Sequence, residues 1–472
     1  MVQIDVNREA LGFGLSTASV SARLRAWLGG SGEHALTKWV VGTAYTIRVA
    51  SAVVVYLSQI ALARWMGNSE FGIYVYVWTW VLLIGDVIHL GLPLAAQRLI
   101  PAYNAANANG SLRGFVFGAW RFALVFAVAG SIVGAFLIRF MTPWLDPRQI
   151  IPFYLACISL PFVTLSIVLD GIARNYNWIG LALAPHFLWR PLLVLALIAV
   201  AYATGYSADA VTAMAIVAIA AAVLAAIQLA MISRRLAAVI APGARRYEIK
   251  SWLAVSLPMI LVWGFYTLLT YTDVIMLQQF RSSEDVAHYY GAARTLLLVS
   301  FVYFSVAAAV AHRFTSLHLA GNRAVLAAFV ARTVHWTFWP SLLATILILA
   351  LGWPLLRLFG PDYVTAYPTM FVLAIGPLAR ASVGPAERLL NMLGEQRACG
   401  FIYAGAFAVN LLGCFVLIPR IGVVGAAIAT STAVIFESIA LYVISKHRLG
   451  LHVFVFGGNR SILLDRGYGH GS

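Results

Sequence analysis

The chain has 472 residues, of which 62% are hydrophobic and only 10% are charged, whereas a soluble protein carries about 25% charged residues. This composition excludes a soluble globular protein. The net charge of +15 comes from basic residues at the ends of apolar segments and not from one patch, which argues against a nucleic-acid-binding protein.

Twelve apolar segments follow one another along the chain, and most are long enough to cross a bilayer as a helix of about 20 residues. The apolar runs are continuous and do not alternate, which excludes a lipid-facing β-barrel. The sequence therefore predicts an all-α polytopic membrane protein. The expected spans are residues 39–63, 71–95, 115–138, 151–169, 181–204, 208–231, 252–276, 287–311, 325–351, 364–386, 400–418 and 423–445.

A basic connector, residues 234–250, divides the spans into two sets of six. The two halves look like a direct repeat, because two pairs of similar segments are each separated by 215 residues. Residues 71–74 (FGIY) pair with residues 286–289 (VAHY), and residues 96–98 (AQR) pair with residues 311–313 (AHR). Six spans return each half to the same side, which predicts two parallel six-helix bundles around a central cavity, as in an alternating-access transporter.

The expected organisation has five parts. They are a cytoplasmic N-terminal segment, an N-terminal bundle, a basic cytoplasmic linker, a C-terminal bundle and a cytoplasmic tail, at residues 1–38, 39–233, 234–250, 251–446 and 447–472. Orientation follows from basic residues, which concentrate in cytoplasmic loops. The termini and even-numbered connectors hold 20 of the 32 Lys and Arg, the odd-numbered connectors hold six, and six lie within spans. Both termini are therefore predicted to be cytoplasmic.

An ordered series of short motifs resembles the polysaccharide-transporter (Wzx-like) flippases of bacterial envelopes, which share a superfamily with lipid II flippases and multidrug and toxin extruders. The resemblance covers roughly residues 37–448. The motifs are residues 62–67 (LARWMG), 71–74 (FGIY), 91–92 (GL), Arg98, 256–258 (SLP), Asp273, 289–294 (YYGAAR), Asn410, 417–419 (LIP) and 425–427 (GAA). The chain departs from the lipid II flippases, which add two C-terminal spans, and it carries Arg48 where many drug extruders have an acid.

The resemblance implies a flippase of the bacterial inner membrane. Such a protein moves a polyprenyl-diphosphate-linked oligosaccharide from the cytoplasmic to the periplasmic leaflet by alternating access, for lipopolysaccharide or exopolysaccharide biosynthesis. The implied partners are the lipid-linked glycan, membrane lipids and a polysaccharide polymerase or export complex, with no nucleic acid. No enzymatic activity and no cofactor are expected.

Charges inside the spans need a partner or a function, because a charge in lipid costs at least about 2.5–3.5 kcal/mol. Six arginines face three acids in the spans, and this surplus suits an anionic headgroup, which guanidinium groups bind bidentately. We predict that Arg48, Arg190 and Arg294 bind the diphosphate. Alternatively, Arg190 satisfies carbonyls freed by Pro191. The remaining three are expected to reach the cytoplasmic interface; they are Arg121, Arg332 and Arg380.

The three acids, Asp86, Asp273 and Glu437, are candidates for binding a proton or Na⁺ that couples transport to a gradient. A structural interpretation stays open, in which Arg48 pairs with Asp86 and Asp273 pairs with Arg294. No metal site is expected, because Cys157, Cys399 and Cys414 lack metal-ligand spacing.

Two other functions remain as alternatives. A multidrug-extruder-like cation antiporter favours surplus acid in its cavity, and this sequence shows the reverse. A polytopic polysaccharide polymerase or ligase generally needs extended loops carrying acids, His or Arg, and the longest connectors here have about 20 residues or fewer. The isolated histidines His186 and His335 are interpreted as structural.

Overall fold

The computed structural model describes residues 33–319 and 321–457, and for residues 33–49, 308, 309, 311, 312 and 315 it describes the backbone alone. Within these ranges every regular element is a helix. Ten helices there are long and apolar enough to cross a membrane. Two of them are divided by a glycine with a non-helical backbone, Gly67 in one and Gly422 in the other. Because each of these two helices supplies two spans, the described part of the chain contains the twelve crossings that the sequence predicts.

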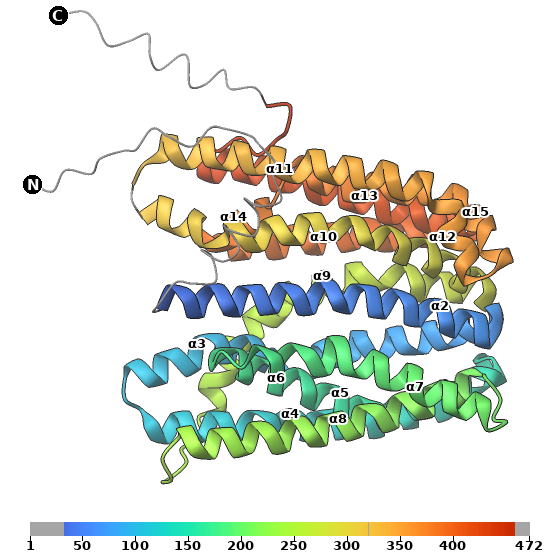
Figure 1. Cartoon of the computed structure of the whole chain (residues 1–472), viewed down its shortest axis with the longest axis horizontal. Helices are drawn as coiled ribbons and strands as arrows, with labels where there is room; N and C mark the ends of the chain where they lie inside the picture. Colours follow the sequence, from blue (N-terminus) through green and yellow to red (C-terminus); the bar gives the residue numbers. More distant parts are fainter. Residues whose placement is uncertain (1–32, 320, 458–472) are drawn as a thin grey trace, which may run out of the picture.

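The two halves form two bundles that lie side by side, blue to green and yellow to red in Figure 1. The N-terminal bundle contains α2 (Glu33–Ile88), α3 (Leu92–Ala105), α4 (Asn109–Met141), η1 (Thr142–Trp144), α5 (Pro147–Asn175), α6 (Ile179–Ala184), η2 (Pro185–Trp189), α7 (Arg190–Ala203) and α8 (Ala210–Val239). The second half contains α9 (Ile249–Phe280), α10 (Ser283–Leu319), α11 (Arg323–Ala350), α12 (Gly352–Phe359), η3 (Pro361–Ala366), α13 (Tyr367–Ser382), α14 (Ala386–Met392), α15 (Gln396–Ile444) and η4 (Ser445–Leu449). The predicted all-α, two-bundle fold is confirmed.

The helices differ from the predicted spans mainly in length and continuity. Residues 64–70 were expected as a connector, yet α2 passes through them with a kink at Gly67, where φ is +75°. Gly422 makes the equivalent kink in α15 with φ of +62°. Glycine reaches this left-handed region without the steric penalty of a side chain, so each pair of crossings is joined by one residue. We call the end of the molecule that contains Gly67 and Gly422 the outer end, and the opposite end the inner end.

The buried apolar side chains form three clusters, and their positions define the conformation. One cluster belongs to both bundles at the outer end and includes Phe71, Leu277 and Tyr289. The other two lie toward the inner end, one confined to the first half together with Trp252, and one confined to the second half. The bundles therefore share a core at the outer end and keep separate cores at the inner end.

Polar contacts reinforce the closed outer end. The guanidinium of Arg64 donates to the backbone carbonyls of Arg357 and Leu358, at 2.8 and 2.7 Å. Asn68 donates to a carboxylate oxygen of Asp362 at 2.9 Å. A Cβ on Gly72 would lie 1.8 Å from a backbone oxygen at the start of α10, so only glycine allows α2 and α10 to approach this closely.

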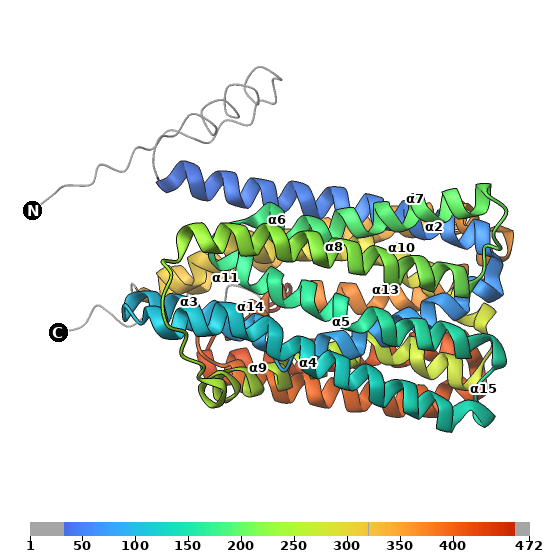
Figure 2. The same ribbon diagram turned by 90° about the horizontal axis from the view of Figure 1, so that it is seen from below.

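One helix, α9, belongs to both bundles. Near its start, Trp252 is 1% exposed and packs edge-on against Phe115 of α4, with ring centroids 5.3 Å apart. Further along, Asn410 of α15 donates to the backbone carbonyl of Leu269 at 3.2 Å. Figures 1 and 2 show α9 running from α3 and α4 at the inner end to α15 at the outer end.

Candidate functional site

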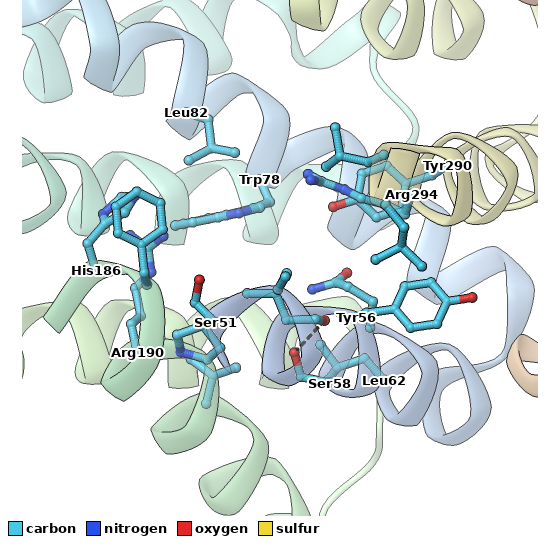
Figure 3. A pocket seen from close by; sticks show the side chains of 18 of the residues that line it. Ser51, Tyr56, Ser58, Leu62, Trp78, Leu82, His186, Arg190, Tyr290 and Arg294 are labelled. Atoms are coloured by element: carbon cyan, nitrogen blue, oxygen red, sulfur yellow. Dashed lines mark hydrogen bonds between the residues drawn. The ribbon is translucent and has the colours of Figure 1, made fainter. Parts of the chain in front are cut away.

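A cavity of about 350 Å³ lies between the two bundles. Its walls come from α2, η2, α7 and α8 on one side and from α9 and α10 on the other. This position matches the central cavity that the two-bundle prediction requires. Figure 3 shows Arg190 and His186 at one side of the cavity, Arg294 and Tyr290 at the other, and Trp78 between them.

A local irregularity of the helix precedes Arg190. Residues Pro185–Trp189 form a π-helical turn, and α7 starts at Arg190. Pro191 has no N–H to donate to the carbonyl of Phe187, and a π turn accommodates such an interruption. The guanidinium carbon of Arg190 lies 5.0 Å from the ring centroid of Trp78, a cation–π contact that holds the charge in the cavity.

Arg294 is held from the other bundle in a similar way. Its guanidinium carbon lies 4.6 Å from the ring centroid of Tyr290, one helical turn earlier on α10. The next residue, Thr295, shares a hydrogen bond of 3.1 Å with Tyr56 of α2. This contact joins the two bundles beside the arginine.

The cavity is positively charged. Four ion pairs occur among the residues with described side chains, namely Arg148–Asp146, Arg174–Asp170, Arg246–Glu248 and Arg380–Glu437. Neither Arg190 nor Arg294 takes part in these four ion pairs. Among the described residues that line the cavity there is no Asp or Glu. The structure thus brings two of the three predicted diphosphate ligands together. The third, Arg48, lies on α2, but its side chain is outside the described residues.

The three acids occupy different places. Asp86 is on α2 and does not line the central cavity. Asp273 lines a separate cavity of about 170 Å³ inside the C-terminal bundle. There its carboxylate accepts hydrogen bonds from Tyr289 at 2.5 Å and from Thr430 at 3.3 Å. The alternative pairing of Asp273 with Arg294 is therefore not found.

Glu437 is paired with Arg380, whose guanidinium donates to both carboxylate oxygens at 3.2 and 2.6 Å. The expectation that Arg380 reaches the cytoplasmic interface is wrong. The side chain of Glu437 is only 2% exposed, and a buried carboxylate without a partner is far less favourable than one in a hydrogen-bonded pair. The other two arginines of that group, Arg121 and Arg332, are exposed.

Several cavity residues were not predicted as site residues. Tyr56, Gln59, Trp78 and Tyr271 line the cavity, and a buried carbonyl oxygen of Gln59 has no hydrogen-bond partner among the described residues. His186 also lines the cavity, although it was interpreted as structural. The only sequence signal for these positions is helical spacing, such as the four residues that separate Tyr290 from Arg294.

Comparison with known proteins identifies related sequences. Residues 40–317 match a family model described as "Polysaccharide biosynthesis protein". The uncharacterized membrane protein MJ1068 of Methanocaldococcus jannaschii is 29% identical over 168 residues, which are 34% of this chain and 32% of that protein. The uncharacterized transporter YisQ of Bacillus subtilis is 26% identical over 211 residues, 43% of this chain and 46% of that protein. The matches thus span less than half the length of these relatives.

Solved structures with a similar fold are transporters. An inward-facing multidrug resistance MATE family transporter of the MOP superfamily aligns with a TM-score of 0.69 and 13% identity, over 86% of this chain and 98% of that one. The lipid II flippase MurJ, in an inward closed conformation, aligns with a TM-score of 0.69 and 14% identity, over 86% and 87%. At such identities the likeness shows the fold.

Proposed function

Because the chain belongs to the polysaccharide biosynthesis protein family and has the fold of MOP-superfamily transporters, we propose that it flips a polyprenyl-diphosphate-linked oligosaccharide across the membrane. It is a multi-pass membrane protein. The observation that carries the proposal is the central cavity, to which each bundle contributes one arginine, Arg190 or Arg294.

The chemistry of a lipid diphosphate fits this cavity in two respects. Guanidinium groups bind phosphate oxygens bidentately and stay charged, and two of them on opposite walls suit a group with several anionic oxygens. Along the α10 wall, Leu297, Phe301 and Phe304 provide apolar surface for the first isoprene units. A cationic drug would meet repulsion from both arginines, which argues against the extruder alternative.

The arrangement also suggests how binding is coupled to movement. The bundles share a core at the outer end and have separate cores at the inner end, so the cavity belongs to a state closed at the outer end. A diphosphate that bridges Arg190 and Arg294 would draw the bundles together around it. Alternating access then requires the outer contacts, such as those of Arg64, to open.

The orientation, location and partners complete the proposal. The excess of Lys and Arg in the even-numbered connectors supports cytoplasmic termini in a bacterial inner membrane. Export of a lipid-linked glycan would feed a polysaccharide polymerase or export complex. Transport, and no chemical reaction, is the proposed activity.

Ion coupling remains a prediction for Asp86, Asp273 and Glu437. Two hydroxyl groups, those of Tyr289 and Thr430, lie beside the Asp273 carboxylate, and Asp273 lines a cavity. Glu437 would have to exchange Arg380 for a cation. Asp273 is therefore the acid that the geometry favours for this role.

The test is accumulation of lipid-diphosphate-linked glycan in a deletion strain. Wild type should remove the accumulated glycan, whereas Arg294→Ala and Arg190→Ala should each reduce export by about 10-fold or more, because a hydrogen bond to a charged group contributes about 1.5–3 kcal/mol. Arg332→Ala is the matched control, since Arg332 is exposed and does not line the cavity. Normal export by both cavity variants, or no accumulation in the deletion strain, would refute the proposal.

A further inference from the structure

A second pocket lies between the bundles, at the outer end, with a volume of about 300 Å³. The N-terminal bundle contributes Ser69, Tyr76 and residues 144–146, 148 and 149 of the η1–α5 segment. The second half contributes residues 278, 279 and 281–284, at the end of α9 and the start of α10. We call it the outer pocket.

The outer pocket and the central cavity lie in series along the interface between the bundles. On α10, Ser283 lines the outer pocket, and Tyr290, about two turns further inward, lines the central cavity. Between these two residues the interface is closed: Val286 of α10 is fully buried, and Phe71 of α2 is fully buried against Tyr290, with ring centroids 6.1 Å apart. We call this closed region the constriction. Gly72 of α2 lies against the α10 backbone at Ser283, so the two helices are also in close contact beside the outer pocket. A group that leaves the central cavity toward the outer end therefore passes this constriction and reaches the outer pocket.

The charges of the outer pocket are already compensated, unlike those of the central cavity. The guanidinium of Arg148 forms an ion pair with Asp146 at 3.0 Å and donates to Ser69 at 3.0 Å. The guanidinium of Arg281 donates to the backbone carbonyls at residues 418 and 419, at 3.2 and 3.1 Å. Glu284 adds a further negative charge. This balance disfavours an anion such as the diphosphate.

The remaining polar groups are neutral amides and aromatic rings. The side-chain oxygen of Gln278 is buried and has no hydrogen-bond partner among the described residues. Gln149 is only 4% exposed, and Gln279 donates to the hydroxyl of Tyr76 at 2.9 Å. The indole of Trp144 is 72% exposed at the pocket. Amides offer both donors and acceptors, and an exposed ring offers a flat apolar face.

We propose that the outer pocket is a second substrate site, which binds the saccharide part of the translocated molecule after it has passed the constriction. Sugar hydroxyls donate and accept hydrogen bonds as amides do, and the C–H face of a sugar ring stacks on an indole. The volume lies at the lower end of the range for small-ligand pockets, about 300–1,000 Å³, which suits one or two sugar units. This inference rests on the proposed function.

The experiment uses the full chain in lipid nanodiscs, with glycan released by mild acid from the lipid-linked pool of the deletion strain. Wild type should bind this free glycan. The double variant Gln149→Leu/Gln278→Leu should bind it at least 10-fold more weakly, and Arg294→Ala should bind it as wild type does, because the central cavity holds the diphosphate. Gln97→Leu, an exposed position away from both cavities, is the matched control, and thermal unfolding verifies that each variant is folded.

The outcomes separate this inference from the proposed function. Suppose that the lipid-linked glycan accumulates in the deletion strain. The outer saccharide site is then refuted, while the flippase proposal stands, if wild type does not bind the released glycan. It is refuted in the same way if the folded double variant binds the glycan as tightly as wild type does. If no pool accumulates in the deletion strain, the proposed function fails and the outer site fails with it.

Discussion

The ion pair between Arg380 and Glu437 should stabilise the C-terminal bundle against loss of either partner. Arg380→Met leaves a carboxylate that is 2% exposed without its cation, whereas Glu437→Gln leaves a guanidinium that is 23% exposed and lines the 170 Å³ cavity. Breaking a buried pair on one side costs about 3–5 kcal/mol. We expect Arg380→Met near the upper limit and Glu437→Gln near the lower limit, because water in the cavity can reach the guanidinium.

The double variant Arg380→Met/Glu437→Leu should recover most of that loss, since replacing a buried pair by apolar side chains is often neutral or stabilising by about 1–4 kcal/mol. Equilibrium unfolding in mixed micelles measures all three variants, with exposed Arg332→Met as the control that stays within about 0.5 kcal/mol of wild type. Single variants within about 1 kcal/mol of wild type, or a double variant as unstable as the sum of both, would refute this reasoning.

Two further predictions concern the outer end. Gly72→Ala should destabilise the protein by about 1–3 kcal/mol through overpacking against α10. The control Gly264→Ala, at a position with no neighbour within 4 Å, should be neutral or slightly stabilising in the same unfolding assay. Equal effects of the two substitutions would contradict the close approach of α2 to α10. The hydrogen bond from the Arg148 side chain lowers the pKa of Asp146, so this contact is formed above the ordinary value of 3.8 and is lost as the pH falls through the lower folded-state pKa. Glycan binding should therefore be constant above the ordinary value of 3.8 and decline only at lower pH. An Asp146→Asn variant that keeps the decline would disprove the assignment.

The sequence predicts the fold well because the cost of polar groups in lipid leaves few choices. Continuous apolar runs give the number of crossings, and basic connectors predict their direction. The apolar runs do not reveal whether two consecutive crossings belong to one continuous helix. Residues 64–70 are polar enough to suggest a connector, yet α2 continues through them, and the single glycine Gly67, with its positive φ, is sufficient to reverse the chain direction. The one hint was that this glycine ends the LARWMG motif.

The site was predictable where the energetic penalty of burial singles out a residue. Arg190 and Arg294 are expensive at membrane depth, and both line the central cavity. Partners are harder to predict, because they depend on packing between distant helices. The carboxylate of Asp273 meets Thr430, 157 positions later in the chain, and Arg380 meets Glu437 across α13 and α15. The outer pocket arises from helix ends and connectors, where predicted boundaries are least accurate.

The path of α9 across both bundles limits how the two halves can move. Its start is anchored by Trp252 in the first half and its later turns by Leu269 in the second. Between the anchors lie Pro258, which removes a helix hydrogen bond, and Gly264, which has open space around it. A rotation of one half against the other, as the proposed transport requires, would therefore bend α9 between these two anchors. The bending of α9 would then limit how far the inner end can open. A substitution that makes the helix less flexible at Gly264, such as Gly264→Ala, should therefore slow the transport cycle without weakening substrate binding.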